Sequence, residues 1–382
     1  MAKPLPRAWA NVEEIEELAV PRLPAAIAGY YTGYSGSGVT IKDTRDSFAR
    51  WRLLPRCLRD VSRVDTSCSL LGRKLEMPIL VAPMAMQCMA DPVGESGVAR
   101  ATKELGGGMI LSTMSTISLE EVAQAAGPDG FLMFQLYVLS KREVTEAMVR
   151  RAERAGYKAI VVTVDAPRLG KRDEDERLQF RCPPHLRLAN LAELQKDSAA
   201  ARAGQESSGS GFAAFFTALI DPSLTWECIT WLRGITSLPI FVKGILSPDD
   251  ARQAVKAGVA GIVVSTHGGR QLDGTPAPLD VLPFIARAVA GAVPILIDGG
   301  IRRGSDVLKC LALGATAVLV GRPILWGLTL GGEEGAKAVL STLRTELEHD
   351  MALLGVPSLA QLNEDYIIPP SGGVLALPAA RL

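Results

Sequence analysis

The sequence predicts an α/β protein, a (β/α)8 or TIM barrel with an N-terminal helical cap and a long insertion after strand 4. Three observations predict this class. Eight short apolar runs recur within 382 residues. The runs are nearly continuous in apolar residues, which is typical of strands buried on both faces of a parallel sheet. Helix-like segments separate most of them, and eight such units favour a closed barrel over a six-stranded open sheet.

The predicted strands come first in this assignment. Each is five to seven residues long, rich in Val, Ile and Leu, and bounded by Gly, Pro or polar residues. They cover residues 78–83, 109–113, 131–137, 159–165, 239–244, 261–267, 294–300 and 317–323.

Four intervening segments have the apolar spacing of amphipathic helices: 118–126, 143–155, 247–257 and 305–313. Ser118 and Ser247 fit N-cap positions, and Glu121 three residues after Ser118 completes a capping box. Glycines follow all four segments and fit the C-cap role, because glycine adopts the left-handed conformation without steric cost. They are Gly127, Gly156, Gly258 and Gly314.

We expect one domain over residues 1–382. Residues 1–75 form a cap with at least one helix from Val12 to Tyr30, residues 76–350 form the barrel, and residues 351–382 form a C-terminal tail. The insertion at 170–235 includes a polar stretch rich in small residues at 199–211. Such a long connection predicts a mobile excursion above the barrel, which would act as a lid over the site.

Composition excludes several classes of function. Lys and Arg together number 41, as do Asp and Glu, so zero net charge gives no reason to expect nucleic acid or an anionic membrane as partner. No apolar run approaches the roughly 18–20 residues that span a bilayer. The six cysteines are scattered without a C-x-x-C pair, which indicates free thiols and no metal site.

Polar residues occupy the carboxyl ends of the predicted strands, where barrel enzymes place their chemistry. Each one alone could cap a helix or fill a structural role, but so many around one mouth predict a functional site. They are Gln135, Tyr137, Thr163, Asp165, Lys243, Ser265, His267, Asp298 and Arg322.

The last two strands carry a phosphate signal. The segment D-G-G-I-R-R-G at 298–304 places Gly300 and Arg302 at the start of a helix, and V-G-R-P at 320–323 supplies Gly321 and Arg322. Backbone N–H groups at a helix N-terminus favour an anion, and loops after strands seven and eight are the usual phosphate site of a barrel. An ordinary strand-to-helix turn is the alternative for D-G-G alone.

The neighbouring sequence does not decide the roles of two residues, His267 and Lys243. His267 could be a catalytic base or a structural imidazole. Lys243, at the tip of the fifth strand, could be a Schiff-base nucleophile, a counter-charge for a bound anion, or a buried ion-pair partner.

Five motifs together resemble one family. S-T-H-G-G-R-Q (265–271), T-V-D-A-P-R-L-G-K-R (163–172), F-Q-L-Y-V (134–138), D-G-G-I-R-R-G and V-G-R-P occur in the order and spacing of the FMN-dependent (S)-2-hydroxy-acid oxidases, the group of plant glycolate oxidase and lactate oxidase. The resemblance runs from about residue 12 to the C-terminus and is weakest at 195–212. It implies FMN as the cofactor and no metal.

The resemblance also implies roles at the reacting centre. His267 would take the hydroxyl proton while Asp165 stabilises the resulting imidazolium. Arg172 and Arg270 would bind the substrate carboxylate, with which a guanidinium forms paired hydrogen bonds. Two phenols, Tyr30 and Tyr137, would hydrogen-bond the carboxylate and the reacting oxygen.

Cofactor contacts follow from the same resemblance. Lys243 would stabilise the anion that reduction creates near flavin N1 and O2. Asp298 would bind the ribityl hydroxyls. The isoalloxazine or ribityl chain would contact Ala85, Ser112, Gln135, Thr163 and Ser265. The phosphate would be held by Gly300, Arg302, Gly321 and Arg322.

The chain departs from the glycolate oxidase pattern at three positions that plausibly face the substrate side chain. Met84 replaces the usual Thr, Met114 the usual Trp, and Phe216 a smaller β-branched residue. More apolar surface and one fewer N–H donor favour L-lactate over glycolate. Ala85, where relatives with poor oxygen reactivity often have Gly, favours an oxidase that makes hydrogen peroxide.

Alternatives remain: a photorespiratory glycolate oxidase, an FMN-dependent lactate dehydrogenase with another electron acceptor, a Schiff-base aldolase using Lys243, and a non-catalytic flavin or phosphate binder. The expected partners are a small 2-hydroxy acid and O2, and the resemblance implies a homotetramer or octamer. The terminal Ala380-Arg381-Leu382 resembles a peroxisomal targeting tripeptide, with mitochondrion or cytosol as alternatives.

Overall fold

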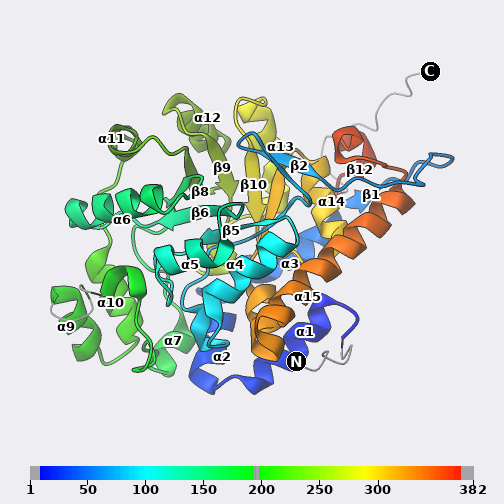
Figure 1. The fold of residues 1–382 in the computed structure, drawn as a ribbon. Helices are drawn as coiled ribbons and strands as arrows, with labels where there is room; N and C mark the ends of the chain where they lie inside the picture. Colours follow the sequence, from blue (N-terminus) through cyan, green and yellow to red (C-terminus); the bar gives the residue numbers. More distant parts are fainter. Residues whose placement is uncertain (1–8, 193, 195–197, 371–382) are drawn as a thin grey trace.

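The centre of the computed structural model, which describes residues 9–192, 194 and 198–370, is a closed barrel of eight parallel strands (Figure 1). Around the barrel the strand order is β10-β11-β4-β5-β6-β7-β8-β9. The strands are β4 (Ile79–Val81), β5 (Gly108–Leu111), β6 (Phe131–Leu136), β7 (Ile160–Thr163), β8 (Ile240–Ile245), β9 (Gly261–Val264), β10 (Ile295–Asp298) and β11 (Ala317–Val320). Each overlaps a predicted run, so the predicted fold class is confirmed.

Burial on both faces explains why the strands are mostly apolar. Leu80, Phe241 and Leu296 belong to the cluster that fills the barrel interior. Their neighbours along the strand, such as Ile79 and Val81, belong to the larger cluster between the barrel and its helices. Because successive side chains of a strand point to opposite faces, both sets must be apolar.

A hairpin of β2 (Cys68–Leu70) and β3 (Arg73–Leu75) precedes the barrel. Its residues Leu70 and Leu75 join the interior cluster. At the other end of the chain, β12 (Ile367–Ile368) pairs with β1 (Arg52–Leu53), which ties the tail to the N-terminal cap.

The predicted caps of the surrounding helices are confirmed. Ser118 accepts a hydrogen bond from Glu121 N, the carboxylate of Glu121 accepts one in return, and Ser247 accepts from two backbone N–H groups. The four predicted C-cap glycines have φ between +69° and +105°. The helices are α4 (Gly94–Glu104), α5 (Leu119–Ala126), α6 (Arg142–Arg154), α12 (Pro248–Lys256), α13 (Pro278–Val289), α14 (Gly304–Ala312) and α15 (Arg322–Leu354), with single turns η2 (Gln87–Met89), η5 (Leu359–Gln361) and η6 (Glu364–Tyr366).

The N-terminal cap contains helices between Val12 and Tyr30, as expected, but they do not form one continuous helix. That segment divides into α1 (Val12–Ala19), the turn η1 (Val20–Arg22) and α2 (Ala25–Thr32), followed by α3 (Val39–Arg50). The reason is local: Pro21 and Pro24 lack the N–H that a continuing helix needs, and each restrains the residue before it.

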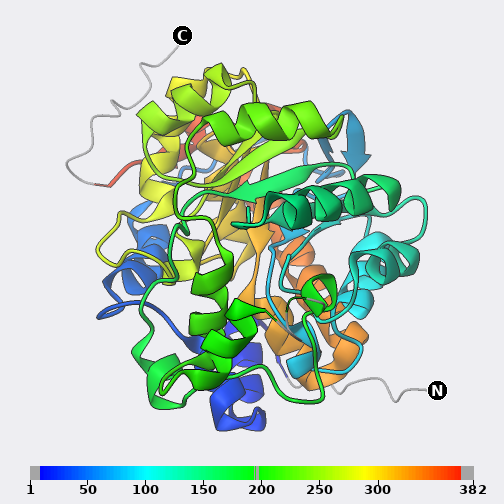
Figure 2. The same cartoon turned by 90° about the vertical axis from the view of Figure 1, so that its left-hand side faces the viewer.

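The insertion after β7 is largely helical. It contains α7 (Asp173–Arg177), η3 (Ala189–Leu191), α9 (Ala199–Glu206), α10 (Gly211–Leu219) and α11 (Glu227–Ile235). The polar stretch that begins at residue 199 thus starts with a helix capped by Ser198. In both views α7, α9 and α10, drawn in green, lie at the end of the barrel where α2 lies (Figures 1 and 2). This position suits a lid, although the mobility of the segment stays a prediction.

Among residues 9–370, leaving aside 193 and 195–197, no helix is long and apolar enough to span a bilayer. Nor does any group of three His, Cys, Asp or Glu side chains in that part of the chain have the geometry of a metal site. All six cysteines are free thiols. The tripeptide Ala380-Arg381-Leu382, and with it the predicted peroxisomal signal, lies outside the described residues.

Candidate active site

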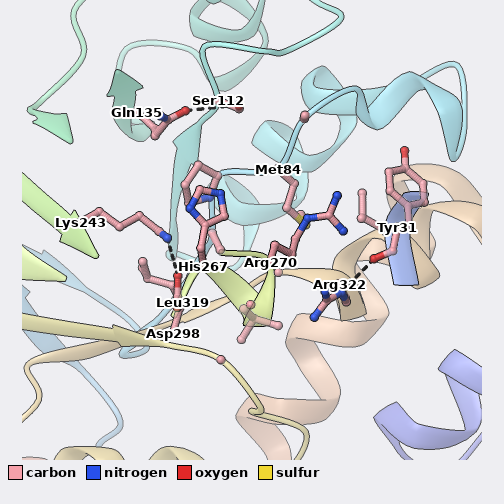
Figure 3. Close-up of a pocket in the computed structure, with 18 of the residues that line it drawn as sticks. Tyr31, Met84, Ser112, Gln135, Lys243, His267, Arg270, Asp298, Leu319 and Arg322 are labelled. Carbon is pink, nitrogen blue, oxygen red and sulfur yellow. Dashed lines mark hydrogen bonds and ion pairs between the residues drawn. The ribbon is translucent and has the colours of Figure 1, made fainter. Parts of the chain in front are cut away.

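One cavity at the carboxyl ends of the barrel strands gathers nearly all the residues that the sequence singled out (Figure 3). Asp165 and Ser265 are the two that do not line it; both hydrogen-bond residues that do. The predicted residues in the lining are Tyr30, Met84, Ala85, Ser112, Met114, Gln135, Tyr137, Thr163, Arg172, Phe216, Lys243, His267, Arg270, Asp298, Gly300, Arg302, Gly321 and Arg322.

His267 enters the cavity from a tight turn that follows β9, η4 (His267–Gly269). Its φ of +58° lies in the left-handed region, and the next two residues, both glycines, share it. A left-handed conformation costs a non-glycine residue on the order of 1–2 kcal/mol, so the surrounding contacts must hold it. One of them is the hydrogen bond from His267 N to Ser265 Oγ at 2.9 Å.

The imidazole of His267 lies between a carboxylate and a phenol. Its Nδ1 is 3.0 Å from Asp165 Oδ1, and its Nε2 is 3.3 Å from the hydroxyl of Tyr137. An ionised carboxylate can only accept a hydrogen bond, so Nδ1 carries the proton and Nε2 carries the lone pair. The His267–Asp165 pair therefore presents Nε2 of His267 to the cavity as a proton acceptor.

Electrostatics favour this neutral imidazole. Burial lowers the pKa of His267 below its ordinary value, Lys243 adds to that effect, and Asp165 opposes it only in part. For Asp165 itself, burial acts to raise the pKa, but the charges of His267 and Lys243 outweigh burial and leave it below the usual range. At neutral pH the carboxylate is ionised and the imidazole is free to take a proton.

Lys243, at the tip of β8, is buried in an ion pair. Its Nζ lies 3.0 Å from Asp298 Oδ2 and donates to Ser265 Oγ at 2.8 Å (Figure 3). The ion pair suits an ammonium that supplies a fixed positive charge, and it disfavours the neutral amine that a Schiff-base nucleophile requires.

Two guanidiniums lie near the phenol of Tyr30. Arg270 donates from Nη1 to the carbonyl oxygens of Tyr30 at 2.7 Å and Gly33 at 2.9 Å, and its Cζ lies 4.8 Å from the centre of the Tyr30 ring. Arg172 is only 4% exposed. Burial, and then the charge of Arg270, lower the pKa of Arg172 to about 10, so Arg172 remains cationic at neutral pH. The two guanidiniums form a wall that can bind a carboxylate.

At the other end of the cavity are two further guanidiniums, the buried Arg302 after β10 and the half-buried Arg322 after β11. Arg322 donates to Tyr31 O and Gly33 O, both at 2.9 Å, and Arg302 pairs with Glu16 at 3.2 Å. Burial lowers the pKa of both arginines, the expected effect of a charge that is only partly compensated. This end of the cavity suits a phosphate dianion.

The unsatisfied polar groups and the free space of the cavity fit FMN. Asp298 Oδ1 and Thr44 Oγ1 are buried and have no hydrogen-bond partner in the described part of the chain, as expected of groups that face polyol hydroxyls. A Cβ added at Gly321 would find no atom nearer than 3.7 Å, which leaves room beside the backbone for a bound group. The arginine pair completes a site that fits FMN.

A buried polar network fixes the cavity floor. Gln135 donates from Nε2 to Thr163 Oγ1 at 2.9 Å, and its Oε1 accepts from Thr113 N at 3.1 Å and from Ser112 at 3.4 Å. With these partners the amide orientation of Gln135 is determined, so its remaining hydrogen-bonding capacity faces a defined direction.

The cavity lining includes the three apolar residues that depart from the glycolate oxidase pattern, Met84, Met114 and Phe216. Met114 is 1% exposed, Met84 is half-buried, and the Phe216 ring meets the Tyr137 ring edge-on at 4.8 Å between centroids. Phe212 and Leu169 also line this region and were not predicted.

Sequence reasoning also missed part of the lining that comes from the cap. Tyr31 on α2 and Ile41, Thr44 and Arg45 on α3 all border the cavity. They lie some 250 residues from the strand tips that they face, and no local motif links them to that mouth. The only available signal was a polar stripe on an otherwise ordinary amphipathic helix.

Comparison with known proteins gives consistent results. Residues 19–369 match the family model described as FMN-dependent dehydrogenase. The chain is 49% identical to human 2-hydroxyacid oxidase 1, over 93% of this chain and 95% of that protein. It is 46% identical to an L-lactate oxidase of Nostoc sp., over 94% and 97%, and 46% identical to glycolate oxidase 1 of Zea mays, over 97% and 98%. Among solved structures, mandelate oxidase with (S)-4-hydroxymandelic acid is similar at a TM-score of 0.87 and 40% identity, covering 92% of this chain and 97% of that one.

Proposed function

The chain belongs to the family of FMN-dependent 2-hydroxy-acid oxidases, with FMN as its cofactor, and from that premise we propose that it oxidises L-lactate to pyruvate in preference to glycolate. The electrons pass to O2, which is reduced to hydrogen peroxide. The observation that carries the proposal is a single cavity in which the His267–Asp165 pair lies near two guanidiniums, the buried Arg172 and the half-buried Arg270.

Substrate binding rests on the two arginines. Their guanidiniums bind the carboxylate of the 2-hydroxy acid and thereby orient its hydroxyl toward the imidazole. The phenol of Tyr137, 3.3 Å from His267 Nε2, adds a hydrogen bond at the reacting oxygen. Burial raises the pKa of Tyr137, so the phenol remains a donor throughout the working pH range.

Proton transfer is the task of His267. Its Nε2 takes the hydroxyl proton, and Asp165 stabilises the imidazolium that results. Bound FMN supplies the two-electron acceptor for the Cα–H electron pair. The ammonium of Lys243, held between Asp298 and Ser265, provides the positive charge that favours this electron transfer.

The lactate preference rests on the apolar wall. Replacing Met114 by Trp should fill the space that receives the substrate methyl, because Met114 is buried and lines the cavity. We expect the ratio of kcat/KM for L-lactate to kcat/KM for glycolate to fall about tenfold, the scale of one methyl in an apolar pocket. Met148→Leu, a buried change on α6 outside the cavity, is the control and should leave the ratio unchanged. A wild-type ratio below one contradicts the preference.

The electron acceptor has its own test. Under air the proposed oxidase should form close to one hydrogen peroxide per L-lactate consumed, measured with a peroxidase-coupled dye. A peroxide yield far below one, with rapid turnover restored by a quinone or an artificial dye, would instead identify a dehydrogenase. If the protein were instead an aldolase that forms a Schiff base on Lys243, borohydride would inactivate it in the presence of substrate. The Lys243–Asp298 ion pair disfavours formation of that Schiff base.

The pH profile tests the base. A general base works in its neutral form, so kcat/KM should fall as pH drops through the pKa of His267. Burial lowers this pKa, so the acid limb should lie below the ordinary histidine value of about 6.5. Asp165→Asn removes the group that raises the pKa. It should therefore move the acid limb to still lower pH and reduce the maximal rate roughly tenfold or more. A limb that moves to higher pH would contradict this assignment.

A further inference from the structure

Asp175, in the first turn of α7, is a buried carboxylate that the mechanism above does not use. It is 2% exposed and lies 3.5 Å from Nη1 of Arg172, which is 4% exposed. Within the described residues, neither oxygen of Asp175 has a hydrogen-bond partner, and neither does Nε of Arg172. Burying a charge without hydrogen bonds is costly, so its presence here calls for a reason other than stability.

Arg172 lies between Asp175 and the active site. It lines the main cavity together with Tyr30 and Arg270. It also lines a second cavity, whose walls include Asp175 and residues of α10 such as Thr217. Asp175 thus faces the guanidinium from outside the substrate cavity and does not line it.

The charges around Arg172 determine what this wall can bind. The largest charge interactions of Arg172 are with Arg270, Tyr30, Asp175 and Tyr137. Burial raises the pKa of both tyrosines, which are therefore neutral. Burial also raises the pKa of Asp175, but the neighbouring charges of Arg270 and Arg172 oppose that rise. The ionised carboxylate of Asp175 offsets part of the positive charge of the two guanidiniums, and the remaining positive charge suits a single carboxylate group.

We infer that Asp175 is a positioning and specificity-determining residue, which holds Arg172 toward the substrate and reduces the positive charge of the wall that Arg172 and Arg270 form. The site then accepts monocarboxylates and discriminates against dicarboxylates of the same length. This inference rests on the proposed function, because it takes Arg172 and Arg270 as the carboxylate-binding groups. Long-range attraction to a second carboxylate would be stronger without Asp175.

The test uses the FMN holoenzyme and two ligands that cannot be oxidised. Propionate and malonate have the same three carbons but one and two carboxylates, and their dissociation constants follow from the perturbed flavin absorbance. Asp175→Asn keeps the shape and removes the charge. We expect the ratio of the propionate to the malonate dissociation constant to rise about tenfold or more. In turnover assays, Asp175→Asn should also raise kcat/KM for tartronate, a dicarboxylate, relative to kcat/KM for L-lactate.

Matched variants separate charge from structure. Asp175→Glu keeps the charge and should retain the wild-type ratio. Asp173→Asn removes an exposed charge of the same helix and should not change it. Thr217→Lys changes an exposed residue and places an ammonium in the second cavity. It should raise the ratio of the propionate to the malonate dissociation constant as Asp175→Asn does. This variant therefore tests the inference even if Asp175→Asn fails to fold.

Two results would overturn the inference. If Asp175→Asn or Thr217→Lys changes both affinities equally while the wild type oxidises L-lactate, Asp175 has no role in selectivity and the proposed function stands. If the FMN-loaded wild type binds neither propionate nor malonate, the carboxylate site itself is wrong, and the proposed function fails with it.

Discussion

Replacing His267 by Asn is expected to slow the anaerobic reduction of bound FMN by L-lactate roughly 10²–10⁴-fold, the usual contribution of a general base. Asn is the appropriate substitution because it tolerates the left-handed backbone, and His267 has φ of +58°. Its amide can also hydrogen-bond Asp165 while offering no basic nitrogen. The rate is measured by stopped-flow absorbance as the oxidised flavin spectrum bleaches.

His349→Asn is the matched control for this experiment, since His349 is an exposed residue of α15. It should leave the bleaching rate unchanged. Both variants should retain FMN in a one-to-one ratio, because no cofactor contact depends on the imidazole. If the His267 variant bleaches as fast as the wild type, the imidazole does not remove the proton, and the mechanism proposed here is wrong.

Replacing Arg270 by Met has the second-largest expected effect. The Arg270 guanidinium donates hydrogen bonds to Tyr30 O and Gly33 O in the N-terminal cap, and the same side chain lines the cavity. Removing one partner of a buried, hydrogen-bonded charge pair costs about 2–5 kcal/mol, so kcat/KM for L-lactate should fall roughly 10²–10³-fold. Arg270→Lys keeps the charge but not the planar fork, and should lose less.

Steady-state kinetics over a wide range of L-lactate concentrations measure this loss, with FMN content as a check on folding. Arg168→Met is the control, because Arg168 is exposed and lies four residues before Arg172 on the same loop. An Arg270→Met enzyme with a kcat/KM within a few-fold of the wild type would show that Arg270 holds the cap and not the substrate.

Selectivity and chemistry depend on different parts of this site. The proton acceptor is built by β7, β9 and the turn between His267 and Gly269, all of which belong to the barrel. The apolar part of the cavity lining includes Phe216 from α10, in the insertion. Substitutions in the insertion should therefore change substrate preference more than they change the reacting centre.

The sequence by itself determined the architecture. Its information is local: eight continuous apolar runs, Ser118 and Ser247 as helix starts, and glycines that end helices by adopting positive φ. Polar residues at strand tips could be placed in one mouth because parallel barrel strands all end on the same side. The motif around His267 then indicated the cofactor and the reaction class.

Only the tertiary structure decided which charged groups lie close enough to interact. It pairs Lys243 with Asp298, joins Arg302 to Glu16 across 286 residues, and places the Asp175 carboxylate beside Arg172 with no hydrogen-bond partner among the residues that the structure describes. It also brings α3 to the cofactor end of the cavity. The physical reason is that burial and Coulomb interactions depend on distance in space, whereas helix, strand and cap signals depend on neighbours along the chain.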